Sequence, residues 1–353
     1  MVGADLAARL AADLVGPGAA VSPEGSGWDH VAWRVVGADG RPWIVRWGID
    51  ELPALAGERP LVVASPRWRD VLDARDRWQE VPSHRIEVPD GVDAIVAIGG
   101  GSAIDTAKAA SAARGLPLVS VPTTYSGAEW TSFFGVRDSE RRMRGGGAGA
   151  NLHAIVYEPE LTLGLPREVT VGTALNALAH AAEALYVRER TGESDRDALA
   201  GARLIAVWLP QVVERPDDLA AREQLLRGAA HSGAALGGSM LALGHALAQG
   251  LGGRYGRPHG ALNALTLPAA LRFNEPVAAE AIARFGDAVG SEDPATRVEE
   301  LAGLGGFERL RDLGIPEDAA TEVAESVAAR PGAKANPREV TPADVEALIR
   351  SIW

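Results

Sequence analysis

Short apolar runs alternate with helical patterns over the first 160 residues or so. Four of these runs are flanked by polar residues, glycine or proline, and each is predicted to form a strand: 43–47 (WIVRW), 60–64 (PLVVA), 94–98 (AIVAI) and 117–121 (PLVSV). Strands that are apolar at nearly every position are typical of a parallel sheet covered by helices on both faces. A helix is expected over 69–80. The pattern therefore predicts an α/β domain with a parallel sheet over residues 1–160.

From about residue 168 onward the apolar positions follow a helical period instead. Helices are predicted over 169–190, 195–213, 219–251, 262–273, 276–289 and 342–352. Thr341 is the expected N-cap of the last helix, with Pro342 at its first position. We expect an all-α domain over 161–353 and an active-site cleft between the two domains. The first forty residues fit neither pattern clearly, and 16–27 is expected to be loop.

Composition removes several classes of partner. The chain has 353 residues with a formal net charge of −12, which disfavours nucleic acid and anionic membranes because both require a basic surface. It has no cysteine, and hence no disulfide or thiol nucleophile. The charge-free segment 228–253 contains histidines and many glycines and is interpreted as buried helix rather than a membrane span. The expected location is the cytoplasm.

The strongest local motif is Gly99-Gly100-Gly101-Ser102, where a predicted strand meets a predicted helix. Glycines let the backbone approach a bulky anion without a Cβ clash, and a helix N-terminus favours negative charge. With Ser102 as the N-cap, the motif indicates a pyrophosphate site; a tight turn without a ligand is the other interpretation. The spacing matches neither the GxGxxG fingerprint nor a Walker loop.

A second loop, 121–127 (VPTTYSG), follows the fourth predicted strand and is rich in hydroxyl groups. Thr123, Thr124, Tyr125 and Ser126 have the donors and acceptors to bind a base, a ribose or a nicotinamide amide. The alternative is that these hydroxyls serve only the turn itself.

Three ordered segments resemble the iron-containing alcohol dehydrogenase family: GGGSAIDTAK (99–108), VPTTYSG (121–127) and NALAHAAEALY (176–186). Within that family, these last two segments and YEPELTLGLP (157–166) are most similar to maleylacetate reductases. The similarity runs from about residue 90 to the C-terminus, including 252–260 and 335–344. It implies a dehydroquinate synthase-like fold, NADH or NADPH as cofactor, a small-molecule substrate and a homodimer.

The resemblance also assigns residues to the cofactor. The glycine loop with its serine would hold the pyrophosphate, Asp105 would lie near the nicotinamide side of that loop, and the hydroxyl loop would line the adenine and ribose. These expected cofactor-binding residues are Gly99, Gly100, Gly101, Ser102, Asp105, Thr123, Thr124 and Ser126.

The family's metal site uses an Asp and a His four residues apart on one helix, then two later His. The matching positions here are Asn176, His180, Gln249 and His259. Spacing of four residues places Asn176 and His180 on one helical face. Because amide side chains are weak ligands for a divalent cation, we expect no catalytic metal. Asn176 and Gln249 are then expected to contact the substrate.

Without a metal, a side chain must supply the proton for catalysis. His180, His245 and His259 are candidates, as is Tyr125, since an imidazole near neutral pKa protonates an enolate or polarises a carbonyl. The alternative is that each histidine is a buried, hydrogen-bonded helix residue. For a carboxylated substrate, Arg254 and Arg257 are candidate clamps, or else solvated turn residues.

Two functions remain open from the sequence. The first is a metal-independent NAD(P)H-dependent reductase of an unsaturated keto acid or related small carbonyl compound, similar to maleylacetate reductase. The second is a non-redox acid–base enzyme, a cyclase, dehydratase or isomerase of a secondary-metabolite biosynthetic pathway, because dehydroquinate synthases share this architecture. A catalytically inactive subunit is a third class. The first domain is expected to be trimmed relative to the family by roughly one helix before the GGGS strand.

Overall fold

The computed structural model describes residues 32–36 and 42–353, so the expected loop over 16–27 lies outside the described residues. Contacts divide the chain into two compact units. The α/β unit comprises residues up to Thr123 together with Thr131–Glu140 and Arg144–Thr162; the helical unit comprises Thr124–Trp130, Arg141–Met143 and Leu163–Trp353. The main division thus falls two residues beyond the expected 160/161 boundary, and most of the hydroxyl loop groups with the helical unit.

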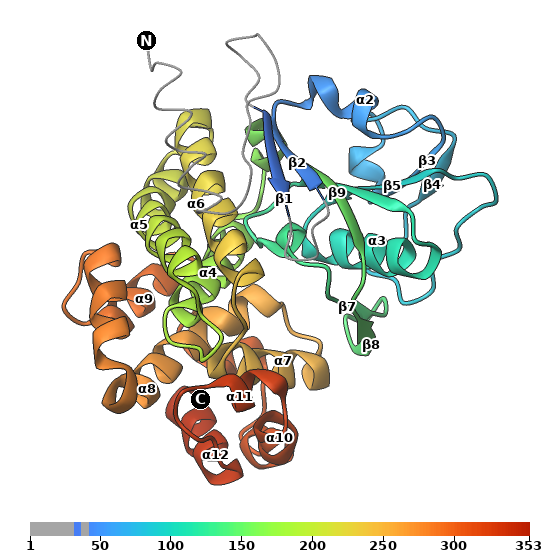
Figure 1. Cartoon of the computed structure of the whole chain (residues 1–353). Helices are drawn as coiled ribbons and strands as arrows, with labels where there is room; N and C mark the ends of the chain where they lie inside the picture. The colour runs from blue at the N-terminus through green and yellow to red at the C-terminus, as the bar shows by residue number, and fades with distance from the viewer. Residues whose placement is uncertain (1–31, 37–41) are drawn as a thin grey trace. The chain divides into compact units, whose positions relative to one another are not determined.

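Within the described residues, seven strands of the α/β unit form one sheet in the order β1-β2-β9-β6-β5-β3-β4 (Figure 1). Neighbouring strands are parallel except for β1 and β2, which are antiparallel. A separate pair is formed by β7 and β8. The bounds are β1 Ala32–Val36, β2 Pro42–Trp47, β3 Pro60–Ala64, β4 Asp76–Trp78, β5 Ala94–Gly99, β6 Pro117–Pro122, β7 Phe134–Arg137, β8 Met143–Gly147 and β9 Asn151–Tyr157.

The central strands are buried on both faces, as their continuous apolar pattern predicts. Val96 and Ile98 of β5 belong to one core cluster with Val119 of β6, while the alternate residues Ile95 and Ala97 are equally buried. The helix α3 (Gly101–Arg114) packs against β5 and β6. The four predicted strands and the parallel sheet are therefore confirmed, each strand to within one residue at either end.

The helix expected over 69–80 is wrong. A short 3-10 helix (Pro66–Trp68) precedes the segment. The segment itself begins with a turn, continues as irregular backbone and then forms the strand β4. Two arginines stabilise this arrangement: Arg59 pairs with Asp76 at 2.9 Å, and Arg77 donates to the Leu72 carbonyl. Pairing of β4 with β3 at the edge of the sheet outweighs the weak helical pattern.

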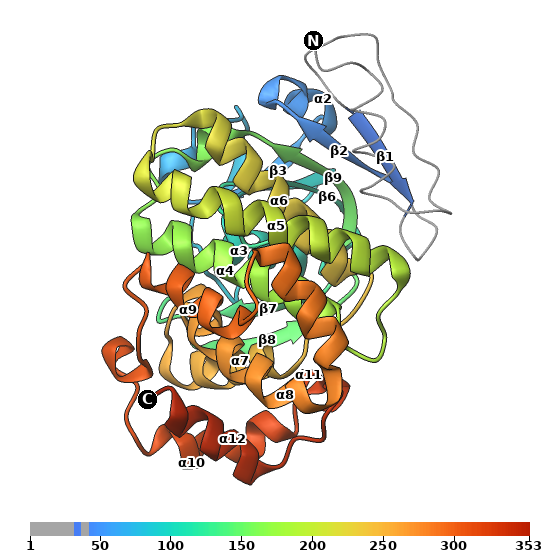
Figure 2. The ribbon, with the colours of Figure 1, turned by 90° about the vertical axis from the view of Figure 1, so that its left-hand side faces the viewer.

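The helical unit contains the longer helices, of which α4, α5 and α6 run side by side (Figure 2). The bounds are α4 Arg167–Ala184, α5 Gly192–Glu214, α6 Leu219–Gly237, α7 Leu243–Tyr255, α8 His259–Val289, α9 Pro294–Gly303, α10 Ala319–Ala328, α11 Pro331–Ala335 and α12 Pro342–Ser351. A short helix, α2 (Leu52–Leu55), lies in the α/β unit. Thr341 caps α12 as predicted, accepting from the Asp344 N–H.

One helix prediction needs correction. The single helix expected over 219–251 is two helices, α6 and α7, separated by residues 238–242. The two helices expected over 262–273 and 276–289 correspond to the two helical segments of α8, which meet at a kink where Ala278 has non-helical backbone angles. The kink lies two residues after Pro276, which fits the effect of a proline inside a helix.

Helices α4 and α8 cross at two glycines. A Cβ added to Gly260 would lie 2.5 Å from the Gly172 carbonyl carbon and closer still to its oxygen. Gly260 follows His259 directly, and Gly172 precedes Asn176 by one turn. This close backbone approach therefore fixes the distance between two helices that carry candidate site residues.

No helix within the described part of the chain is long and apolar enough to span a bilayer.

Candidate functional site

The glycine loop joins β5 to α3 in the α/β unit. Gly99 has φ +153°, and a Cβ there would lie 2.8 Å from the Ala103 Cβ, so this turn requires glycine. Helix α3 begins at Gly101 with Gly100 as its N-cap, and no side chain caps it. The prediction that Ser102 is the N-cap is wrong, because Gly100 adopts the extended backbone of the cap and Ser102 falls within the first turn. A helix N-terminus without a side-chain cap suits a phosphate.

The hydroxyl loop leaves the same edge of the sheet. Gly99 and Pro122 are register partners, and the Thr123 N–H donates to the Gly99 carbonyl at 3.0 Å. Farther along the loop, Thr124 Oγ1 and Ser126 Oγ are buried and make no hydrogen bond within the described residues. Buried hydroxyls without partners are costly unless a ligand or water satisfies them. The glycine turn fits the pyrophosphate of a dinucleotide. The cofactor-binding role of the two hydroxyls stays a prediction.

Asp105 lies one turn into α3. Its Oδ2 accepts from the Gly135 N–H at 3.4 Å, and its Oδ1 lies 3.8 Å from Lys108 Nζ. Burial raises the pKa of the Asp105 carboxyl, and the Lys108 ammonium opposes that shift. Lys108 is itself buried and donates to Thr131 Oγ1 and the Phe133 carbonyl. These contacts tie α3 to residues 131–135; a role for Asp105 beside nicotinamide stays a prediction.

Three histidines from three helices meet in the helical unit. The rings of His180 (α4) and His245 (α7) are stacked with centroids 4.6 Å apart, and the ring of His259 (α8) is tilted toward His245 at 5.7 Å. His180 and His245 are both buried. The sequence motifs placed these residues in one site, and the structure brings them together; their catalytic role stays a prediction.

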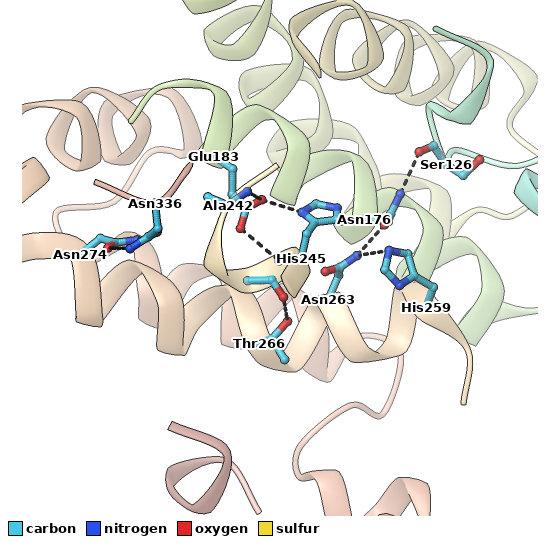
Figure 3. A network of polar contacts seen from close by, with 11 residues as sticks. Ser126, Asn176, Glu183, Ala242, His245, His259, Asn263, Thr266, Asn274 and Asn336 are labelled. Carbon is cyan, nitrogen blue, oxygen red and sulfur yellow. Dashed lines mark hydrogen bonds and ion pairs between the residues drawn. The ribbon is translucent and has the colours of Figure 1, made fainter. Parts of the chain in front are cut away.

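Glu183 also belongs to this cluster, and sequence reasoning missed it. Its carboxylate is buried beside His245, with Oε2 2.8 Å from His245 Nδ1 (Figure 3). The available signal was spacing: Glu183 lies seven residues after Asn176, two helical turns along the same face of α4.

Asn176 and His259, two of the four positions matched to the family's metal ligands, belong to an amide network. Asn176 Nδ2 donates to the Ser126 carbonyl at 2.8 Å, and Asn176 Oδ1 accepts from Asn263 Nδ2 at 2.6 Å. Asn263 Nδ2 also lies 3.1 Å from His259 Nε2 (Figure 3). Both polar atoms of Asn176 are thus engaged by the protein, and Gln249 supplies only a half-buried amide. Within the described residues, no three His, Cys, Asp or Glu side chains gather where they could hold a metal. This donor set does not fit a tightly bound divalent cation.

The remaining candidates make other contacts. Tyr125 is fully buried, and its hydroxyl accepts from Arg222 Nη1 at 3.0 Å, a structural contact. Arg254 pairs with Glu322 at 3.2 Å, and Arg257 donates to the Gly314 carbonyl at 3.3 Å. The proton-donor role of Tyr125 and the substrate-binding roles of the two arginines stay predictions, and these contacts do not favour them.

Comparison with known proteins decides the family. The model of the Fe-containing alcohol dehydrogenase family C-terminal domain matches residues 170–353, and the iron-containing alcohol dehydrogenase model matches residues 83–155. The chain belongs to the iron-containing alcohol dehydrogenase family. A maleylacetate reductase of Sphingobium indicum is 38% identical over 258 residues, covering 73% of each chain. Maleylacetate reductase 1 of Rhodococcus opacus is 32% identical over 343 residues, covering 91% of this chain and 94% of its own.

Solved structures agree with this family. The crystal structure of maleylacetate reductase from Agrobacterium tumefaciens superposes with a TM-score of 0.75 at 29% identity, covering 86% of this chain and 92% of its own. The expected fold, an α/β domain followed by a helical domain, is confirmed. As a member of the iron-containing alcohol dehydrogenase family close to maleylacetate reductases, the chain is an oxidoreductase.

Proposed function

We propose that this protein is a metal-independent NAD(P)H-dependent reductase of an unsaturated keto acid of the maleylacetate class. Relatives named maleylacetate reductase, 35–38% identical over most of the chain, support the reductase function. None of the observations favours the non-redox alternative. The substrate class and the absence of a metal requirement are the parts of the proposal that need experiment.

The α/β unit supplies the features that the pyrophosphate of a dinucleotide needs. The glycine turn at Gly99 and the α3 N-terminus would hold that group. A bound NAD(P)H would supply the hydride. The protein's own residues must then bind the substrate and provide the matching proton.

The amide network is the observation that supports a reaction without a metal. A metal would polarise the substrate carbonyl, but Asn176 has both polar atoms in hydrogen bonds and His259 faces the amide of Asn263. The histidine cluster remains as a source of protons, and it lies within hydrogen-bonding distance of this network. Reduction of a conjugated double bond requires one hydride and one proton, and an imidazolium supplies the second.

A carboxylated substrate needs a cation, and Arg330 suits that role better than the two arginines expected from the sequence. Arg330 is half-buried, makes no side-chain hydrogen bond or ion pair within the described residues, and has its pKa lowered by burial. Its Nη2 lies 4.0 Å from the position of a Cβ on Gly253, which follows His245 and Gln249 at four-residue intervals along α7. A guanidinium without an acceptor is suited to bind a carboxylate.

The test is oxidation of NADH and of NADPH in the presence of maleylacetate, with enzyme dialysed against a chelator and assayed for residual metal. Turnover by metal-free enzyme that does not increase on addition of Fe²⁺ or Zn²⁺ supports the proposal. An absolute metal requirement refutes metal independence, and failure to bind either dinucleotide at millimolar concentration refutes the reductase. Arg330→Gln should raise KM for maleylacetate at least tenfold while the matched control Arg257→Gln leaves KM unchanged.

A further inference from the structure

The buried carboxylate of Glu183 requires an explanation. Its side chain is fully excluded from solvent at the C-terminal end of α4, one turn after His180. A buried carboxylate is strongly destabilising unless charge and hydrogen bonds compensate for the lost hydration. The residues that provide this compensation indicate what the group does.

All of the compensation comes from the first turn of α7. Glu183 Oε2 accepts from the Ala242 N–H at 2.6 Å, and Oε1 accepts from the His245 N–H at 3.1 Å. The positive end of the helix dipole favours a negative charge there. Gly244 leaves the necessary room, because a Cβ at that position would lie 2.9 Å from Oε1. Thr266 Oγ1 donates to the Gly244 carbonyl at 2.9 Å, which holds the same turn from α8 (Figure 3).

The same carboxylate determines the state of the His245 ring. Oε2 lies 2.8 Å from Nδ1, and a carboxylate can only accept, so Nδ1 carries a hydrogen. The other nitrogen, Nε2, is buried and makes no hydrogen bond within the described residues. His259 differs, because its Nε2 faces the Asn263 amide. Among the three site histidines, the described contacts pair only His245 with a carboxylate, which fixes its ring plane and its tautomer.

We propose that Glu183 is the positioning residue that makes His245 Nε2 the proton donor of the reduction, an inference that rests on the proposed function. When His245 is protonated, the Nε2–H bond breaks and the proton joins the carbanion or oxyanion left by hydride addition. His245 returns to the neutral Nδ1–H form and regains its proton from water. The buried negative charge stabilises the imidazolium before transfer, as the third member of a catalytic triad does.

The first experiment observes the tautomer without turnover. Long-range ¹H–¹⁵N NMR of the ¹⁵N-histidine-labelled protein, with the His245 signal assigned by its absence in His245→Asn, should show the neutral ring protonated at Nδ1. In Glu183→Gln, the amide NH2 group must face either His245 Nδ1 or one of the backbone N–H groups that the carboxylate accepted from. The ring should therefore shift to the Nε2–H tautomer or populate both tautomers. A His245 ring protonated at Nε2 in the wild-type protein would overturn the proposal, even if maleylacetate proves to be the wrong substrate.

The second experiment measures turnover. Glu183→Gln should lower kcat about 100-fold while the Kd for NADH stays unchanged. The chain offers a matched control: Asp197→Asn alters another buried carboxylate–imidazole pair, Asp197 Oδ1 to His231 Nδ1 at 3.0 Å, and should leave kcat within twofold. Because Glu183 acts through His245, the double variant Glu183→Gln/His245→Asn should be no slower than His245→Asn alone.

Folded Glu183→Gln with kcat within threefold of wild type would refute the proposal. Equal losses in Glu183→Gln and Asp197→Asn would also refute it, because they would show a merely structural effect. If Glu183→Gln fails to fold, the tautomer of His245 in the wild-type protein still tests the proposal. A correct tautomer in a protein that does not reduce maleylacetate would count against the proposed function alone.

Discussion

Replacement of Gly260 by alanine tests whether the α4–α8 crossing sets the geometry of the site. The added Cβ would lie 2.5 Å from the Gly172 carbonyl carbon, and ordinary contact begins at 3.4 Å, so the backbones must separate by about 1 Å. Neither neighbour is a flexible side chain that could move away. The separation would stretch the 2.6 Å hydrogen bond between Asn263 and Asn176 and move His259 relative to His245.

We expect Gly260→Ala to cost about 1–3 kcal/mol in the free energy of unfolding, the usual range for overpacking. We also expect kcat/KM to fall about 100-fold, because a displacement of 1 Å is enough to disrupt a catalytic arrangement. Urea unfolding and steady-state NADH oxidation measure the two effects on the same preparations. The Kd for NADH should change far less than kcat/KM, since the glycine loop lies in the other unit.

The matched control is Gly303→Ala at the end of α9, where an added Cβ meets nothing within 4 Å. This control should be neutral or slightly stabilising, because alanine favours helix over glycine. If Gly260→Ala keeps both wild-type stability and wild-type turnover, the crossing does not hold the site, and the argument from backbone contact is refuted.

Two further predictions concern other parts of the chain. Gly99→Ala should weaken NADH binding at least tenfold, because an L-residue is strained at φ +153° and its Cβ would lie 2.8 Å from the Ala103 Cβ. Titration with NADH monitored by tryptophan fluorescence measures the Kd, and an unchanged Kd would contradict the prediction. Burial raises the pKa of Asp197 from 3.8 to about 6, opposed by its hydrogen bond to His231. The folded state therefore holds this proton more tightly than the unfolded state, so its contribution to stability declines by about 3 kcal/mol as the pH rises from about 4 through 6. The difference in unfolding free energy between wild type and Asp197→Asn should change by that amount between pH 4 and pH 7, and a pH-independent difference would refute the assignment.

Strands were predictable from the sequence because each central strand is a continuous apolar run bounded by polar residues. Helix boundaries were less predictable where a helix end is set by a residue far away in the chain. Residues 219–251 were predicted to form one helix because the segment contains no proline and its part from 228 onward carries no charged residue. The start of α7 depends on the Glu183 carboxylate, which accepts from the Ala242 N–H 59 residues away in the chain.

Some residues of the candidate site could likewise be predicted from the sequence, and others could not. His180, His245 and His259 were found because they lie within motifs, and their convergence follows from the fold. Glu183 was missed because an acidic residue on a helix is ordinarily solvated, and only its burial beside His245 distinguishes it. Arg330 was missed for a related reason: whether a guanidinium has an acceptor is visible only when its surroundings are known.

The amide network also bears on how the protein matures in the cell. Where a metal organises a site, the chain finishes folding only after the ion is delivered, and its stability varies with the supply of that ion. Here the hydrogen bonds that link Asn176 to Ser126 and Asn263 form from the chain itself. Under the metal independence proposed above, the helical unit completes its site as it folds. We expect newly synthesised protein to reach full activity at a rate independent of iron supply.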